Sequence, residues 1–248
     1  MKIYLSLILP CYNEAEHLKN SFNRLYRVLK QLKKPYEVIF SDDFSKDRTL
    51  EIIKEILAEY KKRKVGFQFI QHTKNLGRGK TVMDGIKVSR GFITGFLDVD
   101  LEVGPEYILK TLPLLDSCDV VVGKRFFPFS FRTIHRYFTS KAYAWMARVV
   151  LNLPVHDSEA GFKFFKKAKI QKILPFVRNS GWFWDTEIVA LSKIFNLKIK
   201  ELPVRYIRRT DKTSTVNTFR DSFVYLWNLI LFVIRIKFSH SGEEPIRR

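Results

Sequence analysis

Cysteine is scarce in this sequence, and its first residues lack the pattern of a targeting segment. The 248 residues include two cysteines, Cys11 and Cys118, both inside apolar stretches. Two such cysteines form no disulfide framework and suit a reducing compartment. The apolar run at residues 3–9 lacks a basic leading region and a small-residue cleavage site, and Pro10 ends it. We therefore expect a first strand there and no signal peptide.

Apolar runs long enough to cross a membrane are also lacking. Residues 222–234 are almost wholly apolar, but a bilayer core needs about 20 residues. Arg220, Arg235 and Lys237 flank this segment, which is typical of a helix lying in the membrane interface. A core helix packed on the sheet is the alternative. A second amphipathic helix is predicted at 137–152, where Phe138, Ala142, Trp145, Met146 and Val149 share one side.

Acidic residues are outnumbered, with 25 Asp and Glu against 44 Lys and Arg and a net charge of +19. Between Lys124 and Arg178, twelve basic residues stand against two acids and alternate with aromatic residues. This mixture suits nucleic acid or an anionic membrane surface. A plain solvated surface would explain the charge but fits the aromatic residues poorly.

Strand-like and helix-like patterns alternate through the first half of the chain. This alternation predicts an α/β fold with a mostly parallel central sheet flanked by helices. The expected strands are 3–9, 36–41, 67–71, 92–97, 119–123 and 198–204, and the expected helices between the early strands are 14–32, 47–63 and 79–89. Pro203 cannot donate to a β-ladder, so the last strand should lie near an edge.

Two carboxylates end one of the predicted strands. The apolar run at 92–97 stops at Asp98, and Asp100 follows two residues later. Side chains alternate along an extended backbone, so the two should point the same way. Paired carboxylates can hold a hard divalent cation, and ligands of open α/β sheets bind at the carboxyl ends of strands. A nucleic-acid-binding protein would leave this pair unexplained, and we expect no nucleic-acid partner.

Three further loops follow strands. Residues 10–14 and 41–45 would lie beside a nucleotide bound at the sheet edge, although Asn13, Ser45 or Asp47 could simply cap helices. The loop at 75–81 resembles a phosphate loop but lacks its first glycine, because that position is Lys74. Gly77 and Gly79 would still permit a close backbone approach to a ligand.

Five motifs in order make a resemblance specific. They are Pro10-Cys11-Tyr12-Asn13-Glu14, Ser41-Asp42-Asp43-Phe44-Ser45, Asn75-Leu76-Gly77-Arg78-Gly79, Asp98-Val99-Asp100 and Asp157-Ser158-Glu159-Ala160-Gly161-Phe162-Lys163. Together they resemble family 2 glycosyltransferases of the GT-A (Rossmann-like) fold, over residues 3 to about 237. Within that family the chain is most similar to dolichyl-phosphate mannose and glucose synthases. The stretch Trp182-Phe183-Trp184-Asp185-Thr186-Glu187 is nearest to the glucose type.

The resemblance implies a set of site residues. Contacts to the nucleotide would come from Pro10, Tyr12, Glu14, Asp42 and Lys212. Asp98 and Asp100 would bind Mg²⁺ or Mn²⁺, together with Glu102, which stands where such synthases often have Gln or His. Catalytic and acceptor-binding roles would fall to Asp98, Asp100, Arg125, Arg132, Asp157 and Lys163.

The implied reaction is an inverting transfer of mannose from GDP-mannose, or glucose from UDP-glucose, to a polyprenyl (dolichyl) phosphate. That acceptor is already anionic near pH 7, so it needs orientation by Arg and Lys more than a strong base. The five histidines are scattered along the sequence and none is an obvious catalytic base, which agrees with this expectation. A family 2 enzyme with a soluble or polysaccharide acceptor is the alternative.

The expected organisation follows from a lipid acceptor. Residues 1–215 would form the catalytic domain, in which 124–152 would face the acceptor and the membrane. Residues 216–238 would form an interfacial amphipathic helix, and 239–248 a flexible tail. We expect a peripheral, monotopic protein at the cytoplasmic face of the cell membrane.

Overall fold

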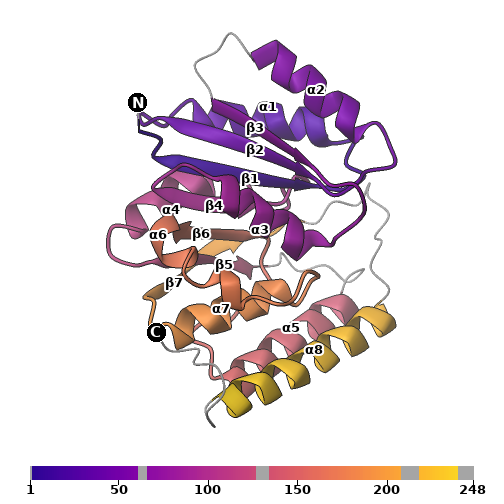
Figure 1. Cartoon of the computed structure of the whole chain (residues 1–248), viewed down its shortest axis with the longest axis vertical. Coiled ribbons are helices and arrows are strands. Elements are labelled where there is room, and N and C mark those ends of the chain that lie inside the picture. Colours follow the sequence, from indigo (N-terminus) through magenta and orange to yellow (C-terminus); the bar gives the residue numbers. More distant parts are fainter. Residues whose placement is uncertain (1, 61–65, 127–133, 208–217, 240–248) are drawn as a thin grey trace.

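Seven strands form a single sheet in the order β3-β2-β1-β4-β6-β5-β7 (Figure 1). The structure is a computed structural model that describes residues 2–60, 66–126, 134–207 and 218–239. The strands are β1 (Leu5–Cys11), β2 (Tyr36–Asp42), β3 (Gly66–Gln71), β4 (Ile93–Leu97), β5 (Val120–Phe126), β6 (Phe162–Lys166) and β7 (Ile199–Arg205). All neighbours are parallel except β6, which runs antiparallel to β4 and β5. The mostly parallel sheet and the edge position of β7 are confirmed.

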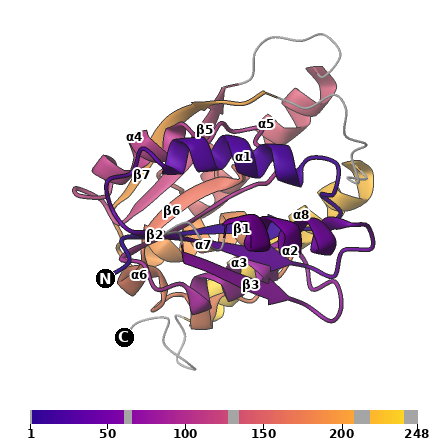
Figure 2. The same ribbon diagram turned by 90° about the horizontal axis from the view of Figure 1, so that it is seen from above.

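Helices cover both faces of the sheet. They are α1 (Leu18–Leu29), α2 (Thr49–Tyr60), α3 (Arg78–Val88), α4 (Tyr107–Leu114), α5 (Ile134–Leu151), α6 (Lys167–Ile170), α7 (Trp184–Ile194) and α8 (Thr218–Ser239), with a short 3₁₀ helix, η2, at Leu174–Phe176. Figure 2 shows α1 and α4 on one side of the sheet and α3 and α7 on the other. Alternation along β1 explains the division, because Leu7 packs with α1 and Ile8 with α3 and α7.

Helices α5 and α8 lie side by side at the end of the molecule away from β1 (Figure 1). Packing on the core holds for one stripe of the apolar segment 222–234, and the rest of that stretch of α8 is exposed. Tyr225, Leu229 and Phe232 are buried, whereas Phe223, Trp227, Ile230, Leu231, Ile234 and Phe238 are exposed. Among the described residues, no helix is long and apolar enough to cross a membrane.

The sheet brings the carboxyl ends of β1, β2 and β4 to one edge, because these strands are adjacent and parallel. Strand β6, absent from the sequence-based expectations, enters between β4 and β5 and carries Lys163 into the middle of the sheet. The predicted boundary at residues 215 and 216 lies outside the described residues, as does all but the first residue of the segment 239–248.

Candidate active site

Asp98 and Asp100 occupy a turn at the end of β4. The backbone N–H of Leu101 donates to the carbonyl oxygen of Asp98 at 3.1 Å, and Leu101 has a φ of 53°. The two carboxylates are close enough for the charge of Asp100 to add to the raised pKa of Asp98. The predicted reason for this proximity is wrong, since a turn rather than an extended strand brings them together.

Asp98 is held by an arginine and a glycine. Its Oδ1 accepts hydrogen bonds from Arg78 Nε at 3.1 Å and Nη2 at 2.7 Å. Partial burial raises the pKa of Asp98, Arg78 opposes the rise, and Asp100 and Asp185 add to it. A Cβ on Gly161 would lie 1.7 Å from Asp98 Oδ2, so only glycine leaves room for this carboxylate.

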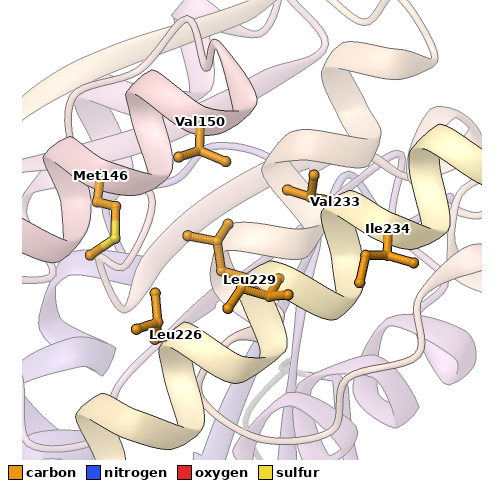
Figure 3. A pocket seen from close by; sticks show the side chains of 7 residues that line it. Met146, Val150, Leu226, Leu229, Val233 and Ile234 are labelled. Atoms are coloured by element: carbon orange, nitrogen blue, oxygen red, sulfur yellow. The ribbon is translucent and has the colours of Figure 1, made fainter.

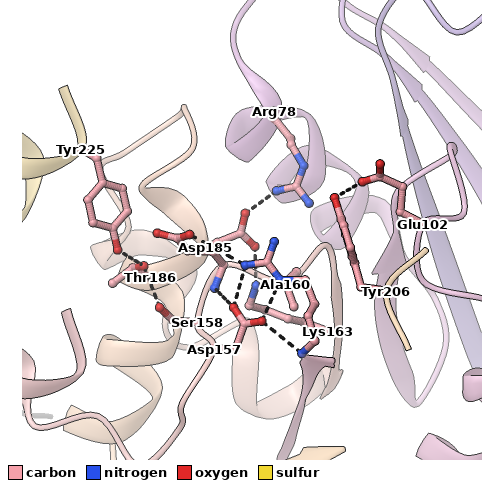
Figure 4. A network of polar contacts seen from close by, with 12 residues as sticks. Arg78, Glu102, Asp157, Ser158, Ala160, Lys163, Asp185, Thr186, Tyr206 and Tyr225 are labelled. Atoms are coloured by element: carbon pink, nitrogen blue, oxygen red, sulfur yellow. Dashed lines mark hydrogen bonds and ion pairs between the residues drawn. The ribbon is translucent and has the colours of Figure 1, made fainter. Parts of the chain in front are cut away.

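Arg78 belongs to a buried network that continues to Lys163 (Figure 4). Asp185, at the start of α7, accepts from Arg78 Nη1 and, at 2.5 Å, from Lys163 Nζ. Lys163 is 0% exposed and also donates to the Ala160 carbonyl oxygen at 2.7 Å. The prediction that Lys163 acts directly in catalysis is therefore corrected. Its ammonium group lies behind Asp185, where it can position that carboxylate but cannot touch a substrate.

Arg125 and Asp157 form a two-pronged ion pair at the end of β5. Arg125 Nε lies 2.7 Å from Asp157 Oδ2, and Nη2 lies 2.8 Å from Oδ1. Burial alone would raise the pKa of Asp157, but the charge and hydrogen bonds of Arg125 hold it below its usual range. Asp157 is 2% exposed, so the structure gives it the task of fixing Arg125 rather than of meeting a substrate.

Glu102 is committed to a tyrosine. Its Oε2 accepts from the Tyr206 hydroxyl, and its backbone N–H donates to Asp100 Oδ1 at 3.2 Å. Among the described residues, no three His, Cys, Asp or Glu side chains are placed to hold one metal ion. The predicted three-carboxylate metal set is thus not assembled, and Asp98 with Asp100 remains the candidate pair.

The loops after β1 and β2 are joined to each other. Asn13 Oδ1 accepts from the Lys46 N–H at 2.8 Å, so Asn13 links the loops and does not cap α1. Asp47 accepts from the Thr49 N–H at 3.0 Å at the start of α2, which confirms the capping alternative there. Asp42 is buried and accepts from Ser45 Oγ at 2.5 Å.

The predicted nucleotide-binding residues differ in exposure. Tyr12 is 41% exposed, whereas Pro10 and Glu14 are half-buried. Gly79 meets a side chain rather than open space, because a Cβ there would lie 2.4 Å from Trp184 Cβ. This glycine lets α3 pack against α7. Arg132 and Lys212 lie outside the described residues.

Residues 6–174 match the model of a protein family described as Glycosyl transferase family 2. The chain belongs to glycosyl transferase family 2. Dolichyl-phosphate beta-glucosyltransferase ALG5A from Trichomonas vaginalis is 28% identical over 220 residues, covering 82% of this chain and 66% of the relative. Dolichol-phosphate mannosyltransferase from Pyrococcus furiosus is 29% identical over 180 residues, covering 68% and 48%. Glycosyltransferase AglD from Haloferax volcanii is 26% identical, covering 88% and 35%. The chain thus spans from about a third to two thirds of these relatives.

Solved structures share the fold of this family 2 chain. Mannosyl-3-phosphoglycerate synthase from Rubrobacter xylanophilus has a TM-score of 0.69 at 14% identity, covering 98% of this chain and 76% of the other. Glucosyl-3-phosphoglycerate synthase from Mycobacterium tuberculosis, in complex with Mn²⁺, UDP and glucosyl-3-phosphoglycerate, has a TM-score of 0.67 at 16% identity, covering 93% and 80%. These likenesses confirm the predicted GT-A fold.

Two residues of this family 2 site were given no specific role from the sequence. Arg78 stands within the motif at 75–79, and Glu159 within the motif at 157–163 and the basic segment, and neither motif gives the residue a task. Glu159 Oε2 lies 3.9 Å from Arg125 Nη2, and the side chain hydrogen-bonds to Tyr225 of α8. Burial raises the pKa of Glu159 to about 7, and Asp157 and Asp185 add to the rise while Arg125 opposes it. The residues next to Glu159 in the sequence give no signal for this raised pKa, because its main cause is burial in the folded chain.

Glu159 should make the stability of this family 2 domain depend on pH. Its carboxyl group binds its proton more tightly in the folded state, with a pKa of about 7, than in the unfolded chain. Its contribution to stability is therefore full at low pH and is lost as the pH rises to about 7. We expect Glu159→Gln to match the wild type near pH 5 and to exceed its free energy of unfolding by up to about 3 kcal/mol at pH 8. Urea unfolding of both proteins across this range measures the difference, and a constant difference would refute the assignment.

Proposed function

We propose that this domain transfers a hexose from a nucleotide sugar, GDP-mannose or UDP-glucose, to a polyprenyl phosphate with inversion at the anomeric carbon. One observation carries the proposal: an exposed apolar helix pair is joined directly to the polar site. The Tyr225 hydroxyl of α8 lies 2.7 Å from Thr186 Oγ1, which lies 2.9 Å from Ser158 Oγ in the motif that contains Asp157 (Figure 4). A lipid phosphate needs such a junction, with a charged end in the site and an apolar chain on the adjoining surface.

The apolar surface is built by α5 and α8. An apolar hollow between them is lined by Met146, Val150, Leu226, Leu229, Ile230, Val233 and Ile234 (Figure 3). Trp145 is 66% exposed on α5, and Trp227 is 54% exposed on α8. Exposed aromatic and aliphatic side chains beside a hollow favour contact with acyl or isoprenoid chains. Membrane association at this surface is part of the proposal.

One basic residue beside this surface serves the protein itself. Arg235 of α8 donates to Glu187 Oε1 at 2.5 Å, and Glu187 also accepts from the backbone N–H of Asn179 at 2.7 Å. This buried carboxylate therefore ties α8 to α7. In the sequence, Arg235 stands out only as a basic residue flanking the apolar segment.

The residues around Asp98 fit a divalent cation. Asp98 and Asp100 offer the oxygen ligands that Mg²⁺ and Mn²⁺ prefer, and their mutual repulsion would be relieved by a cation. A bound cation would neutralise the charge that develops on the departing diphosphate. Glu102 holds Tyr206 through Oε2 and would need to turn toward Asp98 and Asp100 to join them.

The remaining chemistry belongs to the chain's own cations. An oxygen of the acceptor phosphate attacks the anomeric carbon as the bond from that carbon to the diphosphate oxygen breaks. Arg125, near the end of β5 and 13% exposed, would orient the acceptor phosphate. Because that phosphate is already anionic near pH 7, no side chain has to remove a proton from it.

A partition assay tests the proposal. The protein is incubated with Mg²⁺ or Mn²⁺, a polyprenyl phosphate in detergent, and labelled GDP-mannose or UDP-glucose in parallel. We expect label from one donor in the organic phase, and none with Asp100→Asn. Transfer that ignores the lipid and reaches a soluble or polysaccharide acceptor would overturn the proposed acceptor. Binding of nucleotide sugar without transfer from either donor would overturn the proposed sugar or acceptor.

A further inference from the structure

Arg78 bridges two carboxylates in this site, and only one of them belongs to the candidate metal pair. It is the first residue of α3, and its guanidinium group donates to Asp98 through Nη2 and to Asp185 through Nη1. Figure 4 shows Arg78 beside Asp185. Its Cζ lies 5.2 Å from the centre of the Phe96 ring and 5.5 Å from that of Trp182. The two carboxylates and the two aromatic rings together keep the guanidinium group close to Asp98.

The two carboxylates that bind Arg78 differ in how firmly the protein holds them. Asp185 is buried and is fixed by Lys163, whose Nζ lies 2.5 Å from its Oδ1. Asp98 stands in a turn beside Asp100, and its side chain is 35% exposed. The bond to Asp185 can therefore persist when the bond to Asp98 is exchanged for another partner.

We propose that Arg78 is a positioning residue that competes with the divalent cation for Asp98. Arg78 supplies the positive charge at this carboxylate while the cation is absent, so the cation must displace it or share Asp98 with it. A donor diphosphate offers the guanidinium group a strong two-pronged alternative partner. Arg78 held by Asp185 then turns from Asp98 to the diphosphate, and the cation and the nucleotide each favour binding of the other.

The inference rests on the proposed metal role of Asp98, and direct binding measurements test it without turnover. Mn²⁺ binding is followed by electron paramagnetic resonance or calorimetry, with and without UDP or GDP, in the wild type and in Arg78→Met. We expect the variant to bind Mn²⁺ alone about tenfold or more tightly, because the competing charge is gone. We also expect it to bind the nucleotide diphosphate more weakly in the presence of Mn²⁺.

Two further variants serve as controls for this measurement. Arg78→Lys keeps the charge but lacks the planar guanidinium fork that donates twice to Asp98, so its affinity for Mn²⁺ alone should lie between those of the other two proteins. Arg48→Met removes an exposed arginine paired with Glu51 and should bind like the wild type. Equal or weaker Mn²⁺ binding by folded Arg78→Met and Arg78→Lys would overturn the inference alone. Absence of Mn²⁺ binding to every protein, even with nucleotide, would overturn the metal role of Asp98 and the inference with it.

Discussion

Replacing Asp157 with alanine is expected to lower the free energy of unfolding by about 3 kcal/mol or more. The substitution leaves the Arg125 guanidinium group mostly buried without the carboxylate that binds it at 2.7 and 2.8 Å. Glu159, at 3.9 Å, compensates only in part. In a domain of this size the loss corresponds to a fall in melting temperature of roughly 10 °C.

Urea and thermal unfolding measure this effect, and an exposed ion pair supplies the control. Glu51→Gln breaks the contact of Glu51 with Arg48, which is exposed, and should cost less than about 1 kcal/mol. Adding Arg125→Met to Asp157→Ala should recover part of the lost stability, because no buried charge is then left unpaired. A loss for Asp157→Ala no larger than that of Glu51→Gln would show that the buried pair adds nothing.

Replacing Gly161 with alanine is expected to lower the rate of sugar transfer about 100-fold while the domain stays folded. The new methyl group would lie 1.7 Å from Asp98 Oδ2, so the carboxylate has to move. A shift of about 1 Å in such a group is enough to misplace the reacting partners. The same shift should weaken Mn²⁺ binding.

A second glycine, Gly181, gives a matched control for this variant. A Cβ on Gly181 would meet its nearest neighbour, Asn179 Oδ1, at an ordinary 3.6 Å. Gly181→Ala should therefore keep wild-type transfer and Mn²⁺ binding. If Gly161→Ala matched Gly181→Ala in both assays, the position of the Asp98 carboxylate would not limit the reaction.

The parts of the fold that follow from local patterns were predictable. The apolar run before Asp98 predicts β4, and Pro203 predicts an edge strand, because both signals lie within a few residues. Strand β6 was missed because Lys163 interrupts its apolar residues, and its buried partner Asp185 lies 22 residues away in the sequence. Short strands stabilised by distant contacts leave little periodic signal.

The candidate site was predictable in its location but not in its pairings. Strand ends mark where Asp98 and Asp100 lie, whereas the commitment of Glu102 to Tyr206 depends on a contact across 104 residues. The same holds for Arg78 with Asp185, which are 107 residues apart. A motif assigns a side chain to a site, but only tertiary packing decides which charges meet there, so Lys163 was assigned to catalysis and found behind Asp185.

The antiparallel strand β6 has a consequence for how the chain is made. Strands β3, β2, β1 and β4 are complete once residue 97 has been synthesised, but β5 joins them only through β6. In the nascent chain, β5 therefore cannot pair with the first four strands until residues 162–166 have left the ribosome, and α5, which follows β5, waits with it. Chains stalled before β6 should have a protease-resistant first half and a cleavable remainder. Asp98 would gain its neighbour Gly161 only in the last third of synthesis, so the half-made enzyme would carry a folded sheet without an assembled site.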